Sequence, residues 1–141
     1  MNGIVATAEI DIEAPIDRVW SALVDPDQIE KYMFGSRVET DWQVGSPIVW
    51  AGEYDGKPYE DKGEVLAVDE PTRLSVSHFS PLSGQDDVPE NYHTLVYSLA
   101  ANGDGTHLEL SQDNNATEEE AEHSRGMWEQ MLQGIKAHVE G

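Results

Sequence analysis

Residues 14–26 read APIDRVWSALVDP, and this stretch decides how the chain is organised. Pro15 stands where a helix can begin, because proline has no N–H and the first turn of a helix leaves that group unbonded in any case. Val19, Trp20 and Leu23 follow at the spacing of one helix face. The stretch therefore predicts a short helix with one apolar side.

A strand precedes this helix and a second short helix follows it. Residues 5–13 alternate between apolar and polar side chains, as a half-buried strand requires. The apolar face of this strand consists of Ala6, Ala8, Ile10 and Ile12. Asp25 supplies a carboxylate cap and Gln28 stands three residues later, which is the start signal of another helix. Two short helices are therefore expected between the first strand and the rest of the chain.

The middle of the chain, residues 36–112, predicts an antiparallel meander. Turn signals divide it at residues 44–47, 54–57, 69–72 and 102–105. The runs that suit strands are residues 48–54, 63–68, 74–79, 92–100 and 107–110. Asp55-Gly56 and Asp104-Gly105 are strong hairpin signals, so we expect consecutive strands to pair in opposite directions.

The last predicted element is a long amphipathic helix. Thr117, with Glu120 three residues later, forms a capping box at its start. The apolar stripe that follows at helical spacing is Ala121, Ser124, Trp128, Met131, Leu132, Ile135 and Val139. Some 22 residues give about 33 Å of helix, which is enough to cross a sheet.

Length and charge restrict the class of protein. The 141 residues suit one domain, which we expect to span residues 1–141. Eight Lys and Arg against 28 Asp and Glu leave a formal charge of −20, which repels phosphate backbones and anionic bilayers. We therefore expect neither nucleic-acid binding nor membrane insertion. The acidity suits either an acidic mesophile protein or a halophilic one, since concentrated salt screens self-repulsion.

The cellular compartment is inferred from what the sequence lacks. The chain has no cysteine, its start has neither the basic nor the apolar region of a signal peptide, and nowhere do about 18 apolar residues run together. We expect a cytoplasmic protein, either a monomer or a homodimer.

The order of these motifs is similar to that of a known family. The motifs are Ala14-Pro15, Val19-Trp20, Ala22-Leu23, Asp25-Pro26, Val44-Gly45 before Trp50, Asp55-Gly56, Gly63-Glu64-Val65, Glu70-Pro71 before Leu74, Gly105-Thr106 before Leu108, and Trp128 with Leu132. Together they resemble the START-like helix-grip (SRPBCC) superfamily, and within it the family named for homology to the activator of the heat-shock-protein-90 ATPase. The resemblance implies an α+β helix-grip fold, in which a curved antiparallel sheet of about six or seven strands wraps around the long C-terminal helix.

The resemblance also implies a cavity between the long helix and the sheet, and alternation along the strands indicates which side chains face it. The candidate ligand-binding residues are Trp50, Tyr54, Val76, His78, His93, Leu95 and Tyr97 from the strands, with Trp128, Met131, Leu132 and Ile135 from the helix. A mostly apolar wall with a few polar tips is typical of a small-molecule pocket of roughly 300–1,000 Å³. The alternative is that these side chains simply fill the core.

The residues give less support to catalysis. His78, His93 and Tyr97 are candidate acids or bases, and each also suits a hydrogen-bonded core position. There is no cysteine nucleophile and no G-x-S-x-G motif, and no carboxylate stands at ligand spacing from the two histidines. We therefore expect no metal and no cofactor, and we assign no catalytic residue.

Three functions remain open, in descending order of preference. The first is the binding of a small hydrophobic molecule, a lipid or an aromatic metabolite, between the helix and the sheet. The second is an enzyme of the polyketide-cyclase or hydrolase type, which some helix-grip proteins resemble. The third is contact with the chaperone, by analogy with the ATPase activator. The first function requires a hollow larger than one solvent molecule beneath the helix.

Overall fold

The computed structural model describes residues 3–33, 36–54, 56–81 and 84–141, apart from the side chain of Tyr54. Within these residues the predicted α+β architecture is confirmed: one seven-stranded antiparallel sheet, two short helices after the first strand, and a long helix packed on the sheet. None of the described helices is long and apolar enough to cross a membrane.

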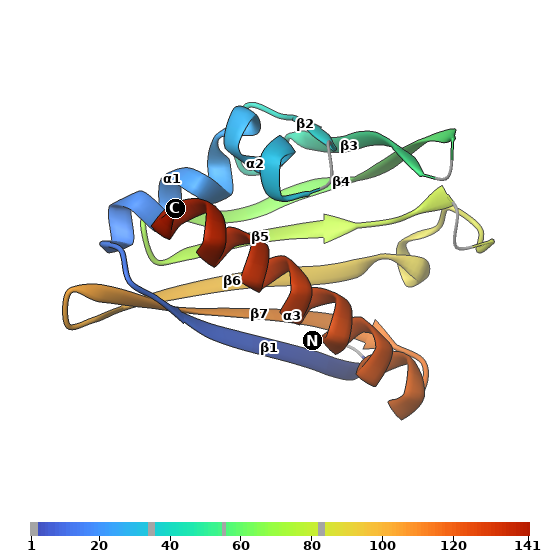
Figure 1. Cartoon of the computed structure of the whole chain (residues 1–141). Helices are drawn as coiled ribbons and strands as arrows, with labels where there is room; N and C mark the ends of the chain where they lie inside the picture. Colours follow the sequence, from blue (N-terminus) through green and yellow to red (C-terminus); the bar gives the residue numbers. More distant parts are fainter. Residues whose placement is uncertain (1–2, 34–35, 55, 82–83) are drawn as a thin grey trace.

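The elements follow the predicted order (Figure 1). The strands are β1 (Ile4–Ile12), β2 (Arg37–Glu39), β3 (Pro47–Tyr54), β4 (Lys57–Asp69), β5 (Arg73–His78), β6 (His93–Asn102) and β7 (Gly105–Asn115). The helices are α1 (Ile16–Val24), α2 (Pro26–Tyr32) and α3 (Glu118–Glu140), with a short 3-10 helix, η2 (Pro89–Asn91), before β6. The strand order in the sheet is β1-β7-β6-β5-β4-β3-β2, so the first strand pairs with the last.

Helix α3 crosses one face of the sheet, with α1 and α2 beside its C-terminal end (Figure 1). The predicted apolar stripe is buried against the sheet, except that Trp128 is only half-buried. Two polar contacts join the end of α3 to β1 and to the residue after it: Lys136 Nζ donates to the carbonyl oxygen of Asp11 at 3.0 Å, and the Glu140 carboxylate accepts from the N–H of Glu13 at 2.8 Å. The position of the long helix is therefore fixed by burial and by its C-terminal contacts.

The predicted helix starts are also observed. The Asp25 side chain accepts from the N–H of Asp27 at the start of α2. Thr117 Oγ1 accepts from the N–H of Glu120 at 3.0 Å, while the Glu120 carboxylate accepts from the N–H of Ala116, one residue before the cap. Both caps satisfy N–H groups that a helix start would otherwise leave unbonded.

The sheet differs from the prediction in β2 and in the lengths of β4 and β7, which extends over Gly105–Asn115 where residues 107–110 were predicted. Strand β4 begins at Lys57, six residues before the predicted run, and pairs with β3 through a tight hairpin. In this register Asp61 lies opposite Trp50, and Tyr59 lies opposite Gly52. Because directly opposed residues share one face of a sheet, Asp61 and Tyr59 lie on the same face as the buried Trp50.

Candidate functional site

Three connected hollows lie between α3, α2 and the sheet. The innermost void, of about 50 Å³, is lined by Met33, Ser36, Trp50, Tyr59, Asp61, His78, Leu95, Tyr97 and Trp128. A second void, of about 20 Å³, is lined by Leu23, Ile29, Tyr32, Met33, Trp42, Ile48, Trp50, Leu74, Val76 and Tyr97. A wider groove, of about 270 Å³, is lined by Tyr32, Met33, Ser36, Tyr59, Met127, Trp128, Gln130 and Met131. The groove and the inner void share Met33, Ser36, Tyr59 and Trp128 in their walls, so they lie next to each other.

The size of these hollows bears on whether the inward-facing side chains line a ligand cavity or fill the core. A void of about 50 Å³ holds more than one water molecule, whose share of liquid volume is about 30 Å³. It is nevertheless far smaller than a typical small-molecule pocket. Most of the inward-facing side chains therefore fill the core, and most of the space for a ligand lies in the groove.

A histidine–carboxylate pair forms the polar part of the inner void. His78, at the end of β5, has its Nε2 atom 3.0 Å from Asp61 Oδ2, and the two side chains are 19% and 17% exposed. The edge of one ring of the Trp50–His78 pair meets the face of the other, with centroids 5.0 Å apart. The remaining polar atoms, His78 Nδ1 and Asp61 Oδ1, are buried and have no hydrogen-bond partner among the described residues.

The polar groups of Ser36, Tyr59 and Trp128 around the hollows already have partners. The hydroxyls of Ser36 and Tyr59 share a short hydrogen bond. The indole N–H of Trp128 donates to Gln112 Oε1 at 3.1 Å. Burial raises the pKa of the Tyr97 hydroxyl well above its usual value, so this group is a neutral phenol at physiological pH. Tyr97 can therefore donate a hydrogen bond but is a poor proton acceptor.

The structure brings together five of the residues expected at the cavity: Trp50, His78, Leu95, Tyr97 and Trp128 all line the inner void. Val76 lines the second void and Met131 lines the groove.

The other expected residues lie elsewhere or cannot be placed. Leu132 and Ile135 are 1% and 0% exposed and belong to the core, outside the described lining of the hollows. His93 Nδ1 lies 2.8 Å from the carbonyl oxygen of Asp113, and His93 is likewise outside that lining. The side chain of Tyr54 lies outside the described part of the structure. His78 and His93 were expected to face the same void. The structure instead places His78 there together with Asp61.

Sequence reasoning missed Asp61, Tyr59 and Ser36 as lining residues. The segment before Gly63 is rich in charged and polar residues, so its sequence does not show the alternation of apolar and polar residues that predicts a strand. The Asp55-Gly56 turn signal nevertheless carried the information, because a two-residue hairpin fixes the register of the strands that it joins. That register places Asp61 opposite Trp50.

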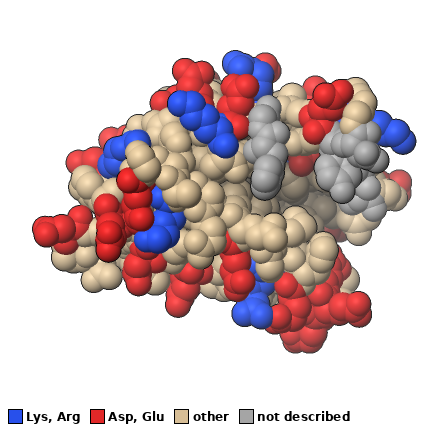
Figure 2. All heavy atoms as spheres, in the orientation of Figure 1, with Lys and Arg blue, Asp and Glu red and all other residues tan. Residues whose placement is uncertain are grey.

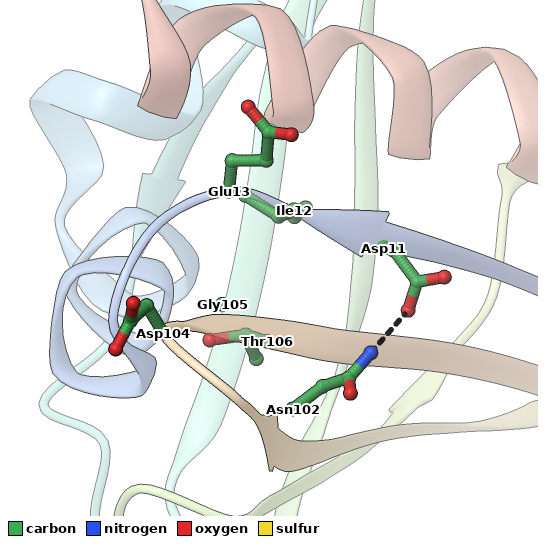
Figure 3. Close-up of a pocket in the computed structure, with 7 residues that line it drawn as sticks. All are labelled: Asp11, Ile12, Glu13, Asn102, Asp104, Gly105 and Thr106. Carbon is green, nitrogen blue, oxygen red and sulfur yellow. Dashed lines mark hydrogen bonds between the residues drawn. The ribbon is translucent and has the colours of Figure 1, made fainter.

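Other surface hollows have less distinctive chemistry. Figure 3 shows a shallow one of about 430 Å³ near the β6–β7 hairpin, in which the carboxylates of Asp11, Glu13 and Asp104 point in different directions. A hollow of about 590 Å³ on the outer face of the sheet includes Glu64 and Asp87 in its lining. Among the described residues, no group of three or more His, Cys, Asp or Glu side chains is arranged to hold a metal ion.

Comparisons with solved structures agree with this architecture. A protein from Cytophaga hutchinsonii, known from its solution structure, is 50% identical, with a TM-score of 0.86 over 99% of this chain and 97% of that one. CalU16 from Micromonospora echinospora is 21% identical, with a TM-score of 0.74 over 98% and 85% of the two chains. The Aha1 dimer from Colwellia psychrerythraea is 18% identical, with a TM-score of 0.73 over 96% of each chain. The last two likenesses show the fold alone.

A comparison with curated proteins gave no match. The family model described as "Activator of Hsp90 ATPase homolog 1-like protein" matches residues 13–140, which is nearly the whole chain. The chain therefore belongs to the family of activator of Hsp90 ATPase homolog 1-like proteins, within the START-like helix-grip superfamily.

Proposed function

We propose that this protein binds a small, mostly apolar molecule between α3 and the sheet, with the apolar part in the groove and a polar group at the inner void. The observation that carries the proposal is the pair of buried, unbonded atoms His78 Nδ1 and Asp61 Oδ1, which belong to two residues that line a void beside an open groove. Buried polar atoms in native proteins nearly always have partners, so a ligand group at this position completes the hydrogen bonding.

The walls of the groove suit an apolar partner. Met33, Met127 and Met131 line it together with the rings of Tyr32 and Trp128. Methionine side chains are flexible and polarizable, so they adapt to ligands of different shape. With about 270 Å³ of space, the groove is near the lower limit of small-molecule pockets. The ligand is therefore small, of the size of a single substituted ring or a short chain.

A titration with benzyl alcohol, an uncharged probe, tests this function. We expect benzyl alcohol to shift the NMR signals of the Trp50 and Trp128 indole N–H groups in a saturable manner. The variant Gln130→Trp places a large ring in the groove and should weaken binding by at least about tenfold. The matched control is Gln133→Trp, at an exposed position of the same helix outside the groove, which should bind as the wild type does. If no cavity signal shifts, or if both variants bind equally well, the proposed function is wrong.

The same pair of residues favours acid–base catalysis as a second candidate. A carboxylate that holds one nitrogen of an imidazole and leaves the other nitrogen without a partner, on a residue that lines a void, orients a general base. Tyr97 lines the same void, and its hydroxyl can donate a hydrogen bond that orients a substrate. Hydrolysis of nitrophenyl acetate that exceeds the background rate and is lost in His78→Gln would support this candidate, and an unchanged rate in that variant would contradict it.

A further inference from the structure

The hydrogen-bonding character of the inner void indicates the chemical class of the ligand. When His78 is neutral and its Nε2 carries the proton, Nε2 donates to the ionised Asp61. The two atoms left over, His78 Nδ1 and Asp61 Oδ1, are then both acceptors. An ammonium group offers three donors, a hydroxyl group offers one, and a carboxylate offers none. Of these three groups, only the ammonium group can serve both acceptors at once.

The electrostatics of the walls favour the same group. Trp50, Tyr59, Tyr97 and Trp128 contribute aromatic rings to the inner void, and none of its described lining residues is Lys or Arg. Aromatic faces attract cations, and a buried carboxylate is costly unless a positive charge or strong donors accompany it. A cation in this void therefore has favourable contacts with both the rings and Asp61, whereas an anion meets a carboxylate.

The surface charge of the protein acts in the same direction. Figure 2 shows Asp and Glu side chains around the edge of the face that carries α3, with mostly uncharged atoms at its centre. With a formal charge of −20, the whole protein raises the local concentration of small cations and lowers that of anions.

We infer that the ligand of this cavity is an organic amine, whose ammonium group donates to Asp61 Oδ1 and His78 Nδ1 while its apolar part packs on the aromatic rings and extends into the groove. This inference rests on the proposed function and specifies its ligand.

Three probes that share one ring test the inference: benzylamine, benzyl alcohol and benzoate. By calorimetry or NMR titration at neutral pH, we expect benzylamine to bind at least about tenfold more tightly than benzyl alcohol, and benzoate to bind more weakly than either. Equal affinities for the amine and the alcohol, or tighter binding of benzoate, would overturn the inference and leave the proposed function intact. Absence of binding by all three probes would instead contradict the proposed function.

A charge-removing variant assigns the effect to one carboxylate. Asp61→Asn keeps the shape of the side chain, and it should weaken benzylamine binding much more than benzyl alcohol binding, so that the preference for benzylamine falls to about twofold. The matched control is Glu60→Gln, which removes the same charge from the neighbouring exposed residue and should keep the preference. If Asp61→Asn keeps the preference, the assignment to Asp61 is wrong.

A measurement on the unmodified protein covers the case in which Asp61→Asn does not fold. Raising NaCl from about 0.05 M to about 0.5 M should weaken benzylamine binding and leave benzyl alcohol binding nearly constant, because salt screens only the charged ligand. The same salt response for both probes would count against an ammonium site.

Discussion

Trp20 and Trp128 make the same kind of hydrogen bond in different surroundings. The indole N–H of Trp20 donates to Glu70 Oε1 at 3.1 Å, and that of Trp128 donates to Gln112 Oε1 at the same distance. Trp20 is 5% exposed within the core, whereas Trp128 is half-buried and borders both the inner void and the groove. A comparison of the two residues therefore shows how much stability a tryptophan contributes when it is packed in the core and how much when it forms a cavity wall.

Truncation should therefore affect stability unequally at these two positions. Trp20→Ala should lower the free energy of unfolding by about 3–5 kcal/mol, as large aromatic deletions in cores do. Trp128→Ala should lower it by only about 1–2 kcal/mol, because part of its ring already faces open space. Urea unfolding followed by circular dichroism measures both values. Equal losses would show that Trp128 is packed as tightly as a core residue.

The contributions of His107 and His138 to the stability of the fold should change in opposite directions with pH. A hydrogen bond to Asp11, helped by Glu9, raises the pKa of His107. The stabilisation from this histidine is complete below its unfolded pKa of about 6.5 and is lost as the pH rises through the higher folded value. Burial, followed by the charges of Arg18 and Lys31, lowers the pKa of His138. His138 therefore favours the folded state at higher pH and opposes it as the pH falls.

Melting temperatures of two Gln variants across this range test both directions. The loss caused by His107→Gln should be larger near pH 5 than near pH 9, and the loss caused by His138→Gln should be larger near pH 9 than near pH 5. Parallel curves for the two variants and the wild type would contradict both assignments.

At the scale of single residues, the apolar walls could be predicted better than the polar pair. Alternation along the strands was enough to place Trp50, Leu95 and Tyr97 on the inner face. Asp61 could not be singled out, because the chain has 28 acidic residues and residue type alone does not reveal which one lies on the inner face. Its position there depends on its partner His78 and on the hairpin register, which are tertiary properties.

At the scale of elements, Gly63 lies near the point where β4 stops pairing with β3 and begins to pair with β5. The N-terminal part of β4 pairs with β3, and its C-terminal part pairs with β5 across a bulge between Val65 and Ala67. A Cβ atom at Gly63 would lie 1.8 Å from the carbonyl oxygen of Ser77, which is backbone and cannot move away freely. Position 63 therefore requires glycine because the backbones of β4 and β5 lie too close together there for a Cβ atom, and not because of an unusual φ angle.

Two Gly→Ala variants should change stability in opposite directions. Gly63→Ala should lower the free energy of unfolding by about 2 kcal/mol or more, because the backbone of β4 or β5 has to shift. Gly126→Ala, within α3, should raise it by about 0.5–1 kcal/mol, since its Cβ atom meets nothing within 4 Å and alanine favours a helix. Chemical denaturation measures both, and a neutral Gly63→Ala would show that the strands can separate at this point.

Among the elements, α3 was the easiest to predict and β2 the hardest. The cap and the apolar stripe of α3 are local signals, readable within the segment itself. Strand β2 has three residues, of which only Val38 is buried, and its regular backbone depends on pairing with β3. A strand that short has no periodic pattern of its own.

At the scale of the whole molecule, the excess of acidic residues should make stability depend on salt. With a formal charge of −20, like charges repel in the compact state, and counter-ions weaken this repulsion. We expect the melting temperature to rise between about 0.05 M and about 1 M ionic strength. NaCl and sodium sulfate at equal ionic strength should raise it similarly if screening dominates, whereas a much larger effect of sulfate would indicate burial-linked salt effects instead.

The overall architecture was more predictable than the dimensions of its interior. Motif order and the family resemblance anticipated the meander, the two short helices and the long helix on the sheet. The size of the voids could not be anticipated, because it depends on how Met33, Trp50 and Trp128 pack, and packing at the scale of a methylene group is not encoded in local pattern. Contact with the chaperone stays a prediction of the resemblance.

The pairing of β1 with β7 has a consequence for biosynthesis. Ile12 pairs with Thr106 and Ile4 with Asn115, so β1 leaves the ribosome long before its partner strand β7. Until β7 emerges, β1 exposes unpaired backbone groups, and the face that α3 later covers stays open. Strand β7 must thus be synthesised before the native sheet can close, and until then the nascent chain exposes a strand edge and an apolar face.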